Sequence, residues 1–214
     1  MHSALDVRKL RCLDGLHYSF LMLRHHHEGL WQTCCGIPGK SANLIAALAA
    51  AWGFIDAVYR IREIAQSVPG LSAKQPEVQA FLTATAPAED YFQYLHHLRS
   101  ELANEHPGNT FPVWGTLSWV DPDHPLRSHM AVVGTQVEGT QYTGCTFDTA
   151  EKKWGSKVCL GVNGKSFGFD PIFAAAMAFE SFVLPLLGER PAAAGESGDV
   201  LPLVSVDFIR GVGT

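Results

Sequence analysis

Apolar residues recur at helical spacing through the first half of the chain. From Leu13 to Leu30 they fall at positions 13, 16, 20, 23 and 30, and His27 occupies the same stripe. Intervals of three and four residues place side chains on one helical face. The next stretch, from the N-cap residue Ser41 to about Gln66, is apolar or small nearly all round. Since such a helix is usually buried, the pattern predicts a central bundle helix there.

Two further helices are predicted before the period changes. Pro76 favours the first turn of a short helix, and another helix is expected from about Ala88 until His106-Pro107-Gly108 stops it. On this second helix the residues expected to point inward are Tyr91, Leu95, Leu98 and Leu102.

The second half of the chain alternates between apolar and polar residues, which is typical of strands. Strands are expected from position 113 to 119 and over 129–136, 140–147, 156–162 and 165–169, with Asn163-Gly164 as a hairpin turn. Asp170-Pro171 favours the start of a helix that runs towards Gly188, with Asp170 as its cap. A loop at 191–199 and a last strand at 201–209 follow.

These elements predict an α+β fold. An N-terminal helical bundle (1–108) is followed by an antiparallel β-meander with a C-terminal helix and a final strand (109–214), and the two parts are expected to form one compact unit.

Composition narrows the class of protein. Hydrophobic residues make up 47% of the 214 residues and charged residues 17%, against about 25% charged in average domains. This excludes an intrinsically disordered chain. The low charge and the apolar helix faces predict a homo-oligomer, most simply a dimer.

The net charge and the length of the apolar runs indicate the compartment and the partner classes of the protein. The net charge is −5, and no basic cluster is longer than Lys152-Lys153, which counts against a dedicated DNA- or RNA-binding protein. The longest charge-free apolar run, 42–55, is shorter than the ~18 residues of a membrane span. The N-terminus lacks a signal-peptide core. We expect a cytoplasmic protein with no membrane or DNA partner and with free thiols, among them Cys145 as core packing on a strand.

Histidines and carboxylates suggest a metal site as one alternative. His25 and Glu28 lie three residues apart, and His97 and Glu101 lie four apart, so each pair shares a helical face and could supply ligands to a divalent metal. No other cofactor is predicted. The competing interpretation is a solvated histidine patch.

A second candidate site lies in the region of His97. Asp90, His97 and Glu101 share a helical face, which fits either a histidine base whose pKa is raised by carboxylates or an ordinary charged surface.

Arg99 and His106 are also two helical turns apart. The stretch from Leu44 to Glu101 contains a long Ala- and Trp-rich helix with Asp56 and Arg60, a Pro-Gly break and a polar helix with histidines, on which Arg99 lies. This stretch resembles the bundle of the HEPN (higher eukaryotes and prokaryotes nucleotide-binding) superfamily. The resemblance implies metal-independent cleavage of RNA, with Arg99 and His106 as the catalytic pair across a dimer. His97 is the alternative to His106 as the histidine of this arginine–histidine motif.

The sequence therefore favours an interaction or regulatory protein without an assigned reaction. A ribonuclease is the first alternative, and only this alternative makes RNA a partner; a metalloprotein is the second.

The expected roles of two further residues depend on which elements pack against them. Trp114 is expected to contact a partner or ligand if no helix covers it. Glu180, within an apolar helix, is expected either to face a cation such as Arg60 or Arg62 or to lie at the solvent edge.

Overall fold

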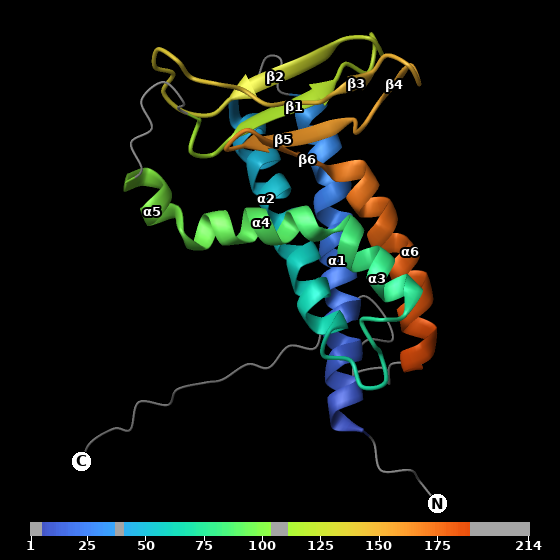
Figure 1. Cartoon of the computed structure of the whole chain (residues 1–214). Helices are drawn as coiled ribbons and strands as arrows, with labels where there is room; N and C mark the ends of the chain where they lie inside the picture. The colour runs from blue at the N-terminus through green and yellow to red at the C-terminus, as the bar shows by residue number, and fades with distance from the viewer. Residues whose placement is uncertain (1–5, 37–40, 104–110, 189–214) are drawn as a thin grey trace, which may run out of the picture.

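Two long antiparallel helices run through the molecule (Figure 1). The computed structural model describes residues 6–36, 41–103 and 111–188. Helix α1 (Val7–Cys35) begins after Asp6, whose carboxylate accepts hydrogen bonds from the backbone N–H groups of Arg8 and Lys9. Helix α2 (Ser41–Ala65) returns along α1. The predicted stripe is confirmed, because its apolar members on α1 are buried: Leu13, Leu16, Phe20, Leu23 and Leu30.

A glycine allows close contact midway along this helix pair. A Cβ atom on Gly53 of α2 would lie 2.5 Å from the ring of His26 on α1. The imidazole therefore occupies the space that a side chain at position 53 would fill. Burial, helped by the neighbouring His25 and opposed by Asp56, lowers the pKa of His26. Lowering the pKa favours the neutral ring at this contact.

Three shorter helices follow α2. Helix α3 (Pro76–Ala84) packs against α6, and α4 (Ala86–His96) crosses α2. The predicted single helix from about Ala88 to His106 is wrong, because His97 ends α4 and a separate helix, α5 (Leu98–Ala103), begins after it. Leu102 was expected to point inward, but it is 60% exposed. Residues 104–110, which include His106, lie outside the described residues.

The second half forms a four-stranded antiparallel sheet. Its order is β2 (Ser128–Val132), β1 (Thr116–Val120), β5 (Val158–Val162) and β6 (Lys165–Gly168). This order departs from a simple meander, because the chain leaves the sheet after β2 and returns beside β1. The chain between β2 and β5 forms a separate two-stranded pair, β3 (Phe147–Asp148) and β4 (Lys153–Trp154). Most of the strand predicted at 140–147 is irregular chain.

The predicted hairpin turn between β5 and β6 is confirmed. Asn163 has φ 47° and Gly164 has φ 75°. Two consecutive positive φ angles are the requirement of a type I′ turn, which Asn-Gly satisfies at low cost.

Helix α6 (Phe169–Leu187) follows β6 directly, and Gly188 succeeds it. Its N-cap is Gly168, so the prediction of Asp170 as the cap is wrong. The inner sheet face and the helices share one hydrophobic core. At its centre, Phe54 of α2 makes edge-to-face ring contacts with Phe167 of β6 and Phe169 of α6. The α+β class is confirmed, whereas the predicted loop at 191–199 and strand at 201–209 lie outside the described residues.

Two helices in the described part of the chain are long and apolar enough to cross a membrane by length and composition: Asn43–Ala65 within α2, and α6. This differs from the sequence expectation, which considered only the shorter run 42–55. In α6 only 28% of the apolar window is buried. The helix therefore presents an apolar surface outward.

Candidate functional site

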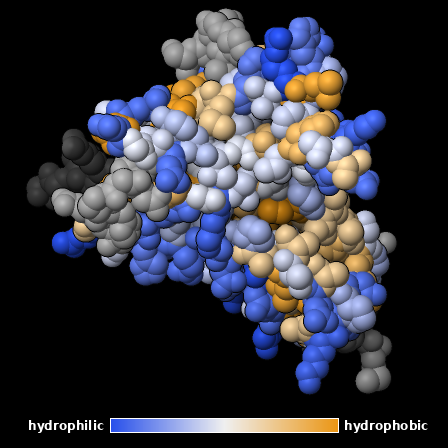
Figure 2. Space-filling view, turned by 45° about the horizontal axis from the view of Figure 1, so that its top comes forward, coloured by the Kyte–Doolittle hydropathy of each residue, from blue (hydrophilic) through white to orange (hydrophobic). Residues whose placement is uncertain are grey.

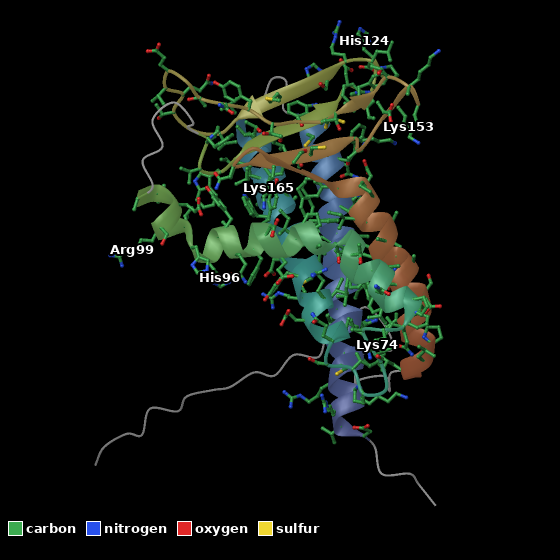
Figure 3. All side chains as sticks on the ribbon, in the orientation of Figure 1. Lys74, His96, Arg99, His124, Lys153 and Lys165 are labelled. Carbon is green, nitrogen blue, oxygen red and sulfur yellow. The ribbon has the colours of Figure 1, made fainter. Side chains whose placement is uncertain are left out.

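The structure describes one member of the predicted nuclease pair. Arg99 is exposed on α5 and points away from the body of the molecule (Figure 3). His106 lies outside the described residues. Because α5 is a separate helix of 6 residues, the continuous helical face that was expected to align these two side chains is interrupted at His97.

The four predicted metal ligands do not come together. His25 and Glu28 are on α1, whereas His97 and Glu101 belong to the α4–α5 region, which extends outward beyond α2 (Figure 1). Across residues 6–36, 41–103 and 111–188 the structure contains no group of three or more His, Cys, Asp or Glu side chains that could hold a metal ion. The break after α4 and its direction across α2 separate the two pairs.

Asp90, His97 and Glu101 line one hollow of about 230 Å³ between α4, α5 and the β5–β6 hairpin. Both carboxylates bind the hairpin: Asp90 is 2.7 Å from the Lys165 ammonium, and Glu101 accepts a 2.8 Å hydrogen bond from Asn163. The three residues predicted to share a helical face therefore lie together in the structure, but the partners of the two carboxylates are on the sheet. These contacts attach the outer helices to the hairpin.

A second pocket, of about 290 Å³, lies where α1 meets the start of α6. In it, His27 Nε2 is 3.4 Å from Asp170 Oδ1, and the imidazole stacks on Phe173 with a centroid distance of 3.9 Å and an interplanar angle of 2°. Stacking fixes the ring plane, and the carboxylate favours the tautomer with the proton on Nε2. The sequence placed His27 in the core stripe; it is partly buried, and Asp170 is its polar partner.

Asp170 is held by the sheet as well as by α1. Its Oδ2 accepts hydrogen bonds from the backbone N–H of Lys157 at 2.5 Å and from Ser156 Oγ at 3.0 Å. Burial alone would raise the pKa of Asp170, but the hydrogen bonds from His27, Lys157 and Ser156 outweigh burial and hold the pKa below its ordinary value. The carboxylate thus joins α1, the segment that leads into β5, and α6 in its charged form.

The rest of the pocket combines apolar walls with a few polar groups. Its walls are formed by Leu30, Trp31, Val158 and Phe169. The Lys157 ammonium lies 5.8 Å from the Trp31 ring centroid, within cation–π range. Glu28 and Gln32 complete the lining. An apolar pocket with convergent polar groups suits a small ligand, whereas the lining residues offer no hydroxyl or thiol nucleophile.

Replacing Asp170 with asparagine is expected to lower the free energy of unfolding by about 1–2 kcal/mol near pH 7, because charge-assisted hydrogen bonds to a partly exposed carboxylate are lost. A lowered folded-state pKa stabilises the protein above the unfolded pKa of about 4, and this stability is lost as the pH falls through the folded value. The difference between wild type and Asp170→Asn in urea unfolding should therefore shrink below about pH 4.

Glu28→Gln is the matched control, since Glu28 is an exposed carboxylate in the same pocket. It is expected to change stability by less than about 0.5 kcal/mol. An Asp170→Asn effect that stayed constant from neutral to acidic pH would contradict the stabilising role of the charged carboxylate.

Exposed apolar side chains lie on the sheet and beside it. Trp114, in the turn that precedes β1, is 46% exposed. Met130, which pairs with Ser118 across β1 and β2, is also exposed. Because its side chain is exposed, Trp114 stays a predicted contact for a partner or ligand.

The outward side of α6 is an apolar surface. Figure 2 shows apolar side chains gathered at the lower right of the molecule, where α6 lies. The exposed positions of α6 are apolar or small: Pro171, Ala174, Ala178, Ser181, Pro185 and Leu186. Partly exposed Phe173, Met177 and Phe182 flank them.

The charged residues of α6 are both engaged with other elements. Asp170 holds His27, and Glu180 forms an ion pair with Arg24 of α1. The sequence considered Arg60 and Arg62 as partners of Glu180, and neither contacts it. With both carboxylates paired, the outward side of α6 presents no free charge.

Comparison with known proteins adds no relative. No protein-family model, no curated protein and no solved structure matches the chain. The similarity of residues 44–101 to the HEPN bundle therefore stays a prediction.

Proposed function

We propose that the protein is a cytoplasmic interaction protein that works as a homodimer, with α6 at the interface between the two copies. No reaction is assigned to it. The observation that carries this proposal is the outward side of α6, which is apolar and uncharged along a helix of 19 residues, about 28 Å in length. Removing such a surface from water is favourable by roughly 25 cal/mol per Å².

A second copy fits this surface better than a membrane does. Helices that lie on membranes carry Lys and Arg on their polar face, where they meet anionic lipids. Helix α6 contains neither residue, and the chain has a net charge of −5. In a two-fold dimer the same face meets itself. Because Glu180 is neutralised by Arg24 within its own chain, such contact brings no unpaired like charges together.

Ala178→Glu tests the interface, because Ala178 is exposed near the middle of the apolar side of α6. Two carboxylates would face each other across a two-fold interface, and like charges in contact cost several kcal/mol. We expect the dissociation constant of the dimer to rise by at least about 100-fold. Sedimentation equilibrium of wild type and variant over a range of concentrations measures this change.

Ala49→Glu is the matched control, since Ala49 is an exposed alanine on a different helix, α2. It should leave the dimer intact. Equal weakening by both variants, a wild-type mass of 23.3 kDa at every concentration, or pelleting of wild type with phosphatidylcholine vesicles would each overturn the proposed interface.

The ribonuclease is not the function we propose. Of its predicted pair, the structure describes Arg99 alone, on the outer side of a short helix. The metalloprotein lacks an assembled ligand set among the described residues. A protein partner at the exposed Trp114 is compatible with the proposed dimer, because Trp114 precedes β1 and is not part of α6.

A further inference from the structure

An irregular segment lies across the outer face of the sheet. This segment, residues 141–146, is called the strap here. The hydroxyl of Thr116 donates to the carbonyl of Thr143, and the N–H of Cys145 donates to Ser118 Oγ at 2.7 Å. Gly161 of β5 makes the approach possible, because a Cβ atom there would lie 2.1 Å from the Thr143 oxygen. Side-chain hydrogen bonds thus hold the strap on the sheet.

The strap places one thiol directly above another. Cys145 Sγ is 3.3 Å from Ser118 Oγ and 3.9 Å from the carbonyl of Lys157. Ser118 pairs with Cys159 in the β1–β5 register, and directly opposed residues have their Cα atoms about 4.5–5.5 Å apart with side chains on the same face. Both thiols therefore lie on the outer face at the junction of β1 and β5.

The two thiols differ in access and acidity. Cys145 is partly exposed and Cys159 is buried beneath it. The hydrogen bond from Cys159, helped by the Ser118 hydroxyl and opposed by burial and Asp170, lowers the pKa of Cys145. The same contact and burial raise the pKa of Cys159. A partly exposed thiol that ionises readily is the more reactive one, since the thiolate is the nucleophile.

Two other thiols in this region are poorer candidates. Cys34 is buried, and burial raises its pKa to about 12. Cys35 is partly exposed like Cys145, but burial and the carboxylates of Asp121 and Asp123 raise its pKa. Cys35 therefore resembles Cys145 in access and differs from it in acidity.

We propose that Cys145 is a hydroperoxide-reactive thiol and that Cys159 resolves it to an intramolecular disulfide. The Cys145 thiolate attacks one oxygen of the hydroperoxide, so that the O–O bond breaks, the second oxygen leaves with a proton as water or alcohol, and Cys145 becomes a sulfenic acid. Cys159 then attacks this sulfur. The S–O bond breaks, the S–S bond forms, and the hydroxyl leaves with the Cys159 proton as water.

The disulfide would join the strap to β5. It would fix the segment that carries the exposed Tyr142 and close a chain loop that contains β3 and β4. Because the bond forms within one chain, its formation does not depend on the proposed dimer, and the two proposals can fail separately.

The test treats the reduced full-length chain with one equivalent of hydrogen peroxide, blocks remaining thiols with N-ethylmaleimide and maps peptides without reduction. We expect loss of two hydrogen atoms per chain and a linked peptide pair that joins Cys145 to Cys159. In Cys159→Ser, Cys145 should stop at the sulfenic acid and be labelled by dimedone. In Cys145→Ser, Cys159 should remain a thiol.

Cys35→Ser is the matched control and should form the Cys145–Cys159 bond at the wild-type rate. Circular dichroism checks that each variant is folded. Oxidation of Cys35 before Cys145, a linkage of Cys145 to Cys34, or five thiols in folded wild type that escape oxidation by the peroxide would overturn the proposal.

Discussion

Replacing Phe54 with alanine is expected to lower the free energy of unfolding by about 3–5 kcal/mol. The ring is fully buried and contacts Phe167 and Phe169 at centroid distances of 6.2 and 5.1 Å. It also lies 5.9 Å from the ring of His27. Because this one side chain joins α2 to the sheet, α6 and α1, its removal leaves a cavity where four elements meet.

Urea unfolding followed by circular dichroism measures the loss. Ile45→Ala is the control, because Ile45 lies on the same helix and is 65% exposed; it should cost less than about 0.5 kcal/mol. Similar losses for the two variants would show that the centre of the core is not where the structure places it.

Arg62→Met is expected to have the second-largest effect, a loss of about 2–3 kcal/mol. The Arg62 guanidinium is buried and donates to the carbonyl of Leu82 at 2.5 Å, to Thr85 Oγ1 at 2.8 Å and to Glu89 at 3.0 Å. Methionine keeps much of the volume but removes every donor. The α3–α4 junction would then lose its hydrogen-bonded attachment to α2.

Arg60→Met provides the matched control on the same helix. Arg60 is 2.7 Å from Asp56, but its side chain is 58% exposed, and exposed ion pairs contribute about 0–1 kcal/mol. Thermal unfolding of both variants compares a buried with an exposed arginine in one helix. A loss for Arg60→Met as large as that for Arg62→Met would contradict the importance of burial.

Elements with a strong local signal were predictable from the sequence. The stripe from Leu13 to Leu30 is the buried side of α1, and the positive φ angles of Asn163 and Gly164 are those that an Asn-Gly turn requires. Helix α6 was likewise found from Asp170-Pro171 at its start and Gly188 at its end. In each case the pattern that predicts the element lies within residues close in sequence.

Elements decided by distant contacts were predicted less well. The segment from Thr140 to Phe147 alternates like a strand, but most of it bonds to side chains of β1 and β6 and not to a neighbouring backbone. Alternation of apolar and polar residues predicts an extended backbone, but it does not predict which groups form hydrogen bonds with that backbone. The break at His97 was missed because the residues before and after it continue a helical pattern.

The same distinction applies to the candidate sites. The grouping of Asp90, His97 and Glu101 follows from helical geometry, whereas their hairpin partners do not. His27 and Asp170 are 143 positions apart, and no local pattern links them. The ion pair of Glu180 with Arg24 spans 156 positions, so it too could be found only from the fold.

The most direct test of the proposed dimer places a photo-cross-linker on α6. Ala178→p-benzoylphenylalanine puts the reactive ketone on the apolar side of the helix, and Ala49→p-benzoylphenylalanine puts it on α2 as the control. On irradiation, the variant at 178 should give a product of twice the 23.3 kDa chain mass, with its cross-linked peptide in α6 of the second copy, and the variant at 49 should not. Cross-links from position 178 that stay within one chain, or a dimer linked equally well from position 49, would contradict the account.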